Sequence, residues 1–125
     1  MFELLYNEIK EYALKNKPEE ICGLILNVGE KNYVFPCKNV SFYKENSSIL
    51  NPINYLNATK IGKVIGMYHS QPNDKPSILD EINSINHNLF SIIYCWNNDK
   101  FYFIEPKLKD YLNKDFKIGQ NDCFE

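Results

Sequence analysis

Short apolar runs of strand length, separated by turn-forming residues, are the feature of this chain that most constrains its fold. Each run is only a few residues long, and glycine, asparagine or proline follows within three residues, which is typical of strands joined by turns. The last two runs flank the turn Asn97-Asn98-Asp99, so they are expected to form a hairpin. The predicted strands are residues 21–28, 33–37, 64–69, 91–96 and 101–105.

Three helices are expected, one before the first strand and two between strands. Residues 2–16 carry apolar side chains at helical spacing, and Pro18 ends that segment. A second helix begins at Pro52 with Asn51 as its cap, and a third covers residues 78–88. The resulting order of elements is helix, two strands, helix, strand, helix, two strands. This order predicts an α+β fold in which a mixed β-sheet is flanked by helices.

The length of 125 residues, with 44% hydrophobic and 24% charged residues, indicates one globular domain, which we place at residues 1–106. Residues 107–125 form a polar, lysine-rich tail. The net charge is −2 and the basic residues are all lysines without a basic stripe, which argues against nucleic-acid binding. No secretory signal and no apolar run long enough for a membrane span is visible, so we expect a cytoplasmic location in the producing cell.

The cysteines are widely scattered and include no C-x-x-C pair, so neither a zinc knuckle nor a thioredoxin-like motif is expected. We interpret the first three as buried thiols. The four positions are Cys22, Cys37, Cys95 and Cys123.

Three short segments carry residues suited to hydrolytic chemistry. Glu20 precedes an apolar strand, His69 and Gln71 stand at the end of another, and Ser77 and Asp80 stand at a helix start. Residues i and i+2 of a strand point to one face, so His69 and Gln71 would face one metal ion if the strand continues through them. A zinc site also needs a carboxylate base and a donor for the developing oxyanion, which Glu20 and Ser77 would supply.

Each of these residues also has an ordinary structural explanation. A histidine at a strand end is commonly a surface or hydrogen-bonded core residue, and Ser77 with Asp80 would cap the helix that they begin. Glu20 alone would be read as a solvated charge. His87, two helical turns beyond Asp80, is interpreted as a surface residue rather than a replacement ligand.

Together the three segments resemble the JAMM motif of the JAMM/MPN (Mov34/PAD-1-like) metallopeptidases. In this chain the motif is Glu20 just before Cys22-Gly23-Leu24, then His69-Ser70-Gln71-Pro72, then Ser77-x-x-Asp80. The resemblance covers roughly residues 1–105 and implies a cytidine-deaminase-like mixed sheet with packed helices. It implies Zn²⁺ held by two histidine positions and an aspartate, here His69, Gln71 and Asp80. It further implies that Glu20 activates water and Ser77 stabilises the oxyanion during cleavage of a peptide or isopeptide bond.

The chain departs from the motif at two places. Gln71 occupies the second histidine position, and a neutral amide oxygen suits hard cations better than zinc. The loop from Pro72 to Pro76 is shorter than is usual in the family, which would shift Asp80. We therefore expect zinc binding to be weakened or absent.

The tail resembles the beginning of an NlpC-type cysteine peptidase domain through Tyr111–Phe116 and Gly119–Cys123, in which an Asp-Cys step holds the nucleophile. Phage tail-tip proteins join a JAMM-like domain to such a peptidase. Because the sequence ends at Glu125, we expect no catalytic histidine to follow and do not expect Cys123 to act as a nucleophile. A tail with a chance Asp-Cys pair is an equal alternative.

Two interpretations remain open. In the first, the chain is a JAMM-like zinc metallopeptidase or isopeptidase domain of a phage tail-tip type protein, and it acts on a protein or peptide substrate. In the second, it is a non-catalytic MPN scaffold that binds other phage tail proteins, and His69, Ser77 and Asp80 form only a hydrogen-bond cluster. The altered position Gln71 favours the scaffold, whereas the four intact positions favour the enzyme. Both interpretations place the protein in the producing cell or, with the tail, on the virion.

Overall fold

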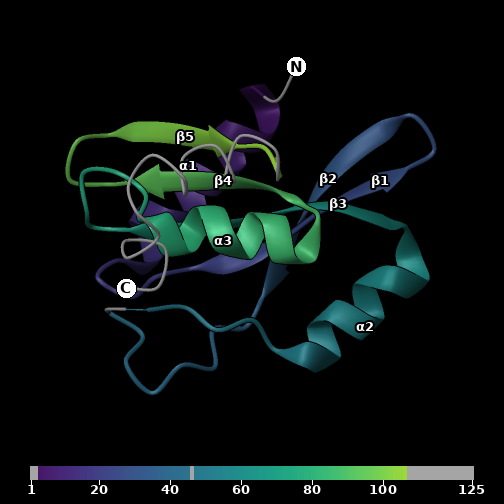
Figure 1. Cartoon of the computed structure of the whole chain (residues 1–125), viewed down its shortest axis with the longest axis horizontal. Helices are drawn as coiled ribbons and strands as arrows, with labels where there is room; N and C mark the ends of the chain where they lie inside the picture. The colour runs from purple at the N-terminus through teal and green to yellow at the C-terminus, as the bar shows by residue number, and fades with distance from the viewer. Residues whose placement is uncertain (1–2, 46, 107–125) are drawn as a thin grey trace, which may run out of the picture.

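A computed structural model describes residues 3–45 and 47–106 of the chain (Figure 1). The elements follow the predicted order and confirm the α+β fold. In chain order they are α1 (Glu3–Asn16), β1 (Cys22–Val28), β2 (Lys31–Cys37), α2 (Pro52–Ile61), β3 (Lys63–Gln71), α3 (Ile78–His87), β4 (Phe90–Cys95) and β5 (Lys100–Ile104).

The five strands form one mixed sheet in the order β2-β1-β3-β4-β5. Three of the neighbouring pairs are antiparallel, while β3 and β4 are parallel and are joined by α3. The parallel pair requires a crossover, and α3 supplies it. The carboxyl end of β3 therefore lies close to the segment that leads into α3. This places the second and third segments of the predicted motif together.

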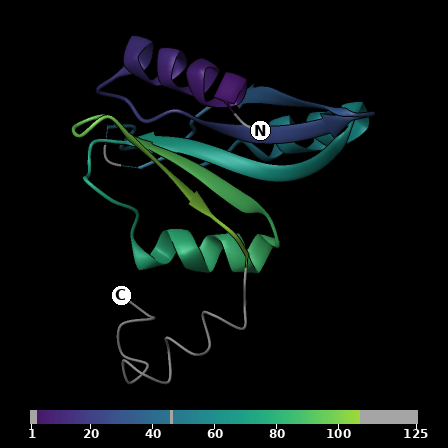
Figure 2. The same cartoon turned by 90° about the horizontal axis from the view of Figure 1, so that it is seen from above.

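Helices cover both faces of the sheet. Figure 2 shows α1 on one face and α3 on the opposite face. Leu5, Ile9 and Ala13 of α1 are buried against one core cluster that includes Ile25 and Tyr68. Alternate residues of β1 point the other way, where Leu24 and Leu26 pack with Ala58 of α2. Each face of β1 is therefore buried, which explains its nearly continuous apolar sequence.

The strand β3 is longer than the sequence predicts. The sequence predicts that this strand ends at residue 69, but residues 70 and 71 also belong to it. The reason is that β3 has a partner on each side, with His69 opposite Cys22 of β1 and Gln71 opposite Cys95 of β4. The extension satisfies the condition for His69 and Gln71 to share one face.

The tail at 107–125, including Cys123 and the resemblance to an NlpC-type peptidase, lies outside the described residues. Within the described residues, no helix combines the length and the apolar character needed to cross a membrane.

Candidate functional site

The five residues predicted from the sequence line one cavity of about 360 Å³. His69 and Gln71 come from the end of β3, and Ser77 and Asp80 from the start of α3. Glu20 lies just before β1 and is buried. The structure therefore brings together three segments that are far apart in the sequence.

Ser70, which the sequence analysis did not select, joins the segment of Glu20 to the end of β3. Its side chain points away from His69 and Gln71 because strand residues alternate. The Ser70 Oγ accepts a hydrogen bond of 2.9 Å from the Ile21 backbone N–H, and the Ser70 N–H donates to the Ile21 carbonyl at 3.1 Å. Ser70 is fully buried. These two bonds hold the neighbour of Glu20 against the strand that carries His69.

His69 lies close to an oxygen of each of the two other candidate ligands. His69 Nε2 lies 3.0 Å from Gln71 Oε1 and 3.6 Å from Asp80 Oδ1. Two ligands that are each about 2.1 Å from one tetrahedral zinc ion stand roughly 3.4 Å apart. The spacing of the imidazole, carboxylate and amide donors therefore fits a metal ion of this size.

The chemistry of the set fits zinc less well than its geometry. Within the part of the chain that the structure describes, no three His, Cys, Asp or Glu side chains are grouped to hold a metal ion. Gln71 fills the third position, and its amide is already engaged: its Nε2 donates to the Lys75 carbonyl at 3.1 Å and contacts Cys95 Sγ at 3.8 Å. The set fits a divalent cation that is held weakly.

Asp80 performs two tasks with its two oxygens. Oδ2 accepts from the Ser77 backbone N–H at 2.8 Å, and the Asp80 N–H donates to Ser77 Oγ at 3.4 Å, which forms a capping box at the start of α3. Oδ1 faces His69. The helix-capping explanation is thus correct, but it uses only one carboxylate oxygen and leaves the other directed at the imidazole.

Glu20 is an unusual carboxylate in this site. Burial, and secondarily the negative charge of Asp80, raises the pKa of Glu20 from 4.5 to about 7. Desolvation disfavours the charged form of a carboxylate, and a neighbouring carboxylate adds to that effect. A carboxyl group with a pKa near 7 can accept a proton at neutral pH and return it in a later step. Glu20 is therefore not the solvated charge of the ordinary explanation.

Asn39 organises the loop between β2 and α2 and holds it against Glu20. Its Nδ2 donates to the carbonyls of Glu20 at 2.8 Å and Ser47 at 3.0 Å. Its Oδ1 accepts from the backbone N–H groups of Ser41 at 3.0 Å and Ile49 at 3.1 Å. All four hydrogen-bonding positions of the amide are used. No local pattern in the sequence distinguishes Asn39 from the other asparagines of the chain.

We expect Asn39→Asp to lower the free energy of unfolding by about 2 kcal/mol, because a carboxylate would replace both donors and face two carbonyl oxygens. Urea denaturation at pH 7 measures the change. The matched control is Asn57→Asp on the exposed surface of α2, where a change below about 0.5 kcal/mol is expected. Equal effects of the two substitutions would show that Asn39 does not organise the loop.

The described cysteines, Cys22, Cys37 and Cys95, are free and buried, as the sequence analysis expected. Burial raises the pKa of Cys22 to about 12 and that of Cys37 to about 11. Such thiols are poor nucleophiles at neutral pH. His87 is exposed, in agreement with its interpretation as a surface residue.

The fold and the cluster define an α+β domain with a polar site at the end of β3. No protein-family model matches the chain. The chain is similar to the Tail tip assembly protein K of Escherichia phage N15, with 29% identity over 119 residues. The match covers 93% of this chain but 49% of that protein, so the chain spans about half the length of this relative. The similarity relates the chain to a phage tail protein.

Proposed function

We propose that the chain is a domain of a phage tail tip assembly protein and that its cavity is a JAMM-type site for zinc-dependent hydrolysis of a peptide or isopeptide bond. The observation that carries the proposal is the single cavity lined by Glu20, His69, Gln71, Ser77 and Asp80. Similarity to a tail tip assembly protein supports the setting, in which other phage tail proteins are partners. From this setting we infer that the chain is made in the producing cell and is associated with the virion through the tail.

In this proposal His69, Asp80 and the Gln71 amide oxygen would hold the metal ion. Zinc, when bound, lowers the pKa of a water molecule and polarises the carbonyl group of the substrate. Glu20 accepts the proton of the attacking water, and its pKa of about 7 allows it to deliver that proton to the leaving amine. Ser77 Oγ accepts from the Asp80 N–H, which leaves its own hydrogen to donate to the oxyanion.

A second candidate function is a scaffold without catalysis, which binds other tail proteins during assembly. The observation in its favour is the hydrogen bonding of Gln71, whose oxygen faces His69 Nε2 and whose nitrogen donates to the Lys75 carbonyl. With those bonds the side-chain amide of Gln71 is paired by protein groups alone. Zinc binding separates the two candidates.

The proposed site predicts that Asp80→Asn weakens zinc binding by at least about tenfold, because a neutral amide replaces the only carboxylate among the proposed ligands. The amide oxygen still can accept from the Ser77 N–H, so the cap of α3 is kept. Titration calorimetry on chelator-treated protein provides the measurement, and Glu81→Gln, on the same turn of α3, is the control. If Asp80→Asn binds zinc with unchanged affinity, the proposed metal site is wrong.

A further inference from the structure

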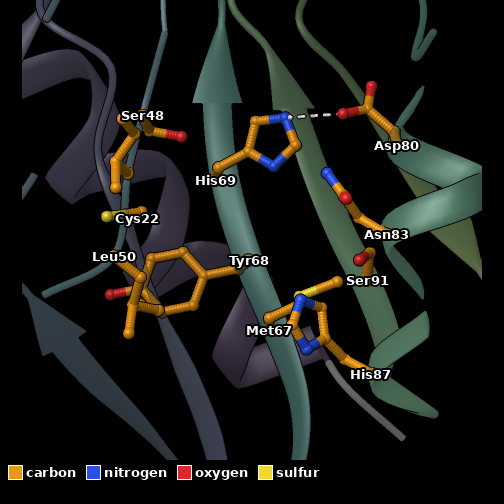
Figure 3. Close-up of a pocket in the computed structure, with 12 residues that line it drawn as sticks. Cys22, Ser48, Leu50, Met67, Tyr68, His69, Asp80, Asn83, His87 and Ser91 are labelled. Atoms are coloured by element: carbon orange, nitrogen blue, oxygen red, sulfur yellow. Dashed lines mark ion pairs between the residues drawn. The ribbon is translucent and has the colours of Figure 1, made fainter. Parts of the chain in front are cut away.

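A second cavity, of about 250 Å³, adjoins the candidate site and shares His69 and Asp80 with it. Figure 3 shows this cavity along β3, with His69 and Asp80 at one end and Met67 and His87 at the other. The shared residues make the cavity continuous with the atoms that would bind the metal ion. Any group in it would lie beside the bond that is cleaved.

The walls of this cavity differ in chemistry. On the α3 side, Asp80, Asn83 and His87 follow one another along one helix face (Figure 3). The opposite side is formed by Cys22 and by the segment Ser48–Leu50, and Met67 of β3 lies between the two sides. The cavity thus has one polar wall and one largely apolar wall.

The apolar wall is rigidly attached to the site. The Ile49 N–H donates to Asn39 Oδ1, the residue that also holds the Glu20 carbonyl. The Ile49 carbonyl accepts from the Val40 N–H at 2.9 Å. Ile49 nevertheless keeps 55% of its side-chain surface exposed. A ligand that covers this exposed apolar side chain removes apolar surface from water, and this favours binding.

We propose that this cavity is a specificity pocket that takes an apolar side chain, of leucine or phenylalanine size, from the residue beside the cleaved bond of the substrate. The position of the cleaved bond rests on the proposed hydrolase function, whereas the binding itself does not. An apolar cavity of roughly 150 Å³ holds a benzene molecule, so a cavity of about 250 Å³ admits a leucine or an aromatic side chain. The adjacent peptide group would then reach His69 and Asp80.

The test is a titration of the metal-free protein, followed by amide NMR spectra, with N-acetyl-leucinamide and with N-acetyl-glutaminamide. The two probes have similar size and no charge, and they differ in the polarity of the side chain. We expect saturable shifts at Leu50, Met67 and Ser91 with the leucine probe, and at least roughly fivefold weaker binding of the glutamine probe. Equal binding of both probes, or shifts elsewhere only, would overturn the pocket.

A pair of matched variants sharpens the test. Ile49→Glu places a charge on the apolar wall, and Ile53→Glu makes the same change on α2, outside the cavity. Both side chains are exposed, at 55% and 65%, so neither change should prevent folding. We expect Ile49→Glu to lower the affinity for the leucine probe at least roughly fivefold. Ile53→Glu should leave that affinity unchanged. An unaltered affinity in Ile49→Glu would also overturn the pocket.

The outcomes for the pocket and for the hydrolase are separable. Binding of the leucine probe together with failure of zinc binding would support the pocket and reject the hydrolase. Zinc-dependent cleavage of a peptide library without preference for an apolar residue beside the cleaved bond would support the hydrolase and reject the pocket.

Discussion

Replacing Gln71 with histidine is expected to raise zinc affinity by on the order of a hundredfold, because an imidazole is a far better zinc ligand than an amide oxygen. The surroundings of Gln71 offer a hydrogen-bond partner for a histidine at this position. Gln71 Nε2 lies 3.1 Å from the Lys75 carbonyl, which would accept a hydrogen bond from the second ring nitrogen. Ligating histidines usually make such a bond, and it fixes the orientation of the ring. Calorimetry after chelator treatment compares the two proteins.

The control for this change is Asn73→His, which adds an imidazole to an exposed loop residue that lines the same cavity. This variant should leave zinc affinity unchanged, because its position is not in β3 beside His69. If Gln71→His also gives no gain, then the short loop at 72–76 holds Asp80 out of reach in solution. If only Gln71→His binds zinc, the metal site of the unaltered chain is inactive. The non-catalytic scaffold is then the better explanation of the function.

Glu20→Gln is expected to abolish hydrolysis and at the same time to stabilise the fold. Loss of a general base lowers the rate by about 10²–10⁴-fold. The pKa of Glu20 is about 7 in the folded protein against an ordinary value of 4.5. Between these pH values the folded chain binds the proton more tightly than the unfolded chain, so the stability contributed by Glu20 falls as pH rises. A pKa shift of this size corresponds to a change of about 3 kcal/mol at most in the free energy of unfolding. Because the folded structure relaxes around the charge, we expect Glu20→Gln to raise the free energy of unfolding by about 2 kcal/mol.

Urea denaturation at pH 4 and pH 8 measures the stability effect. The gain from Glu20→Gln should be present at pH 8 and almost absent at pH 4, where Glu20 is mostly protonated in both states. Glu19→Gln, at the exposed neighbouring position, is the control and should change neither stability nor cleavage of a fluorogenic peptide library. A gain that is the same at both pH values would mean that burial does not raise the pKa of Glu20. Full cleavage by Glu20→Gln would remove Glu20 from the catalytic role.

Local signals predicted most of the fold. Asn51 caps α2 through a bond from the Ile53 N–H, and Pro52 stands at the first position of that helix, as the sequence indicated. Ser77 likewise begins α3. These signals act within a few residues, so they can be recognised without knowledge of tertiary structure. The mixed sheet also followed from the order of elements.

Tertiary contacts explain what the sequence did not show. The extension of β3 to Gln71 depends on pairing with β1 and β4, and neither partner is recognisable from the polar residues themselves. The link from Ser70 to Ile21 brings Glu20 to the site, and the four bonds of Asn39 hold the loop beside it. The pKa of Glu20 also depends on burial, which local sequence does not reveal. The five residues selected by the motif line one cavity, but their surroundings required the structure.

The parallel pair of β3 and β4 has a consequence for how such a site evolves. The crossover places His69, Gln71, Ser77 and Asp80 in one strand–loop–helix segment, while Glu20 belongs to the framework of the opposite strand. A single exchange or a short deletion within that segment alters the ligand set without removing a core residue. The residues that line the cavity can therefore change while the five-stranded architecture is preserved.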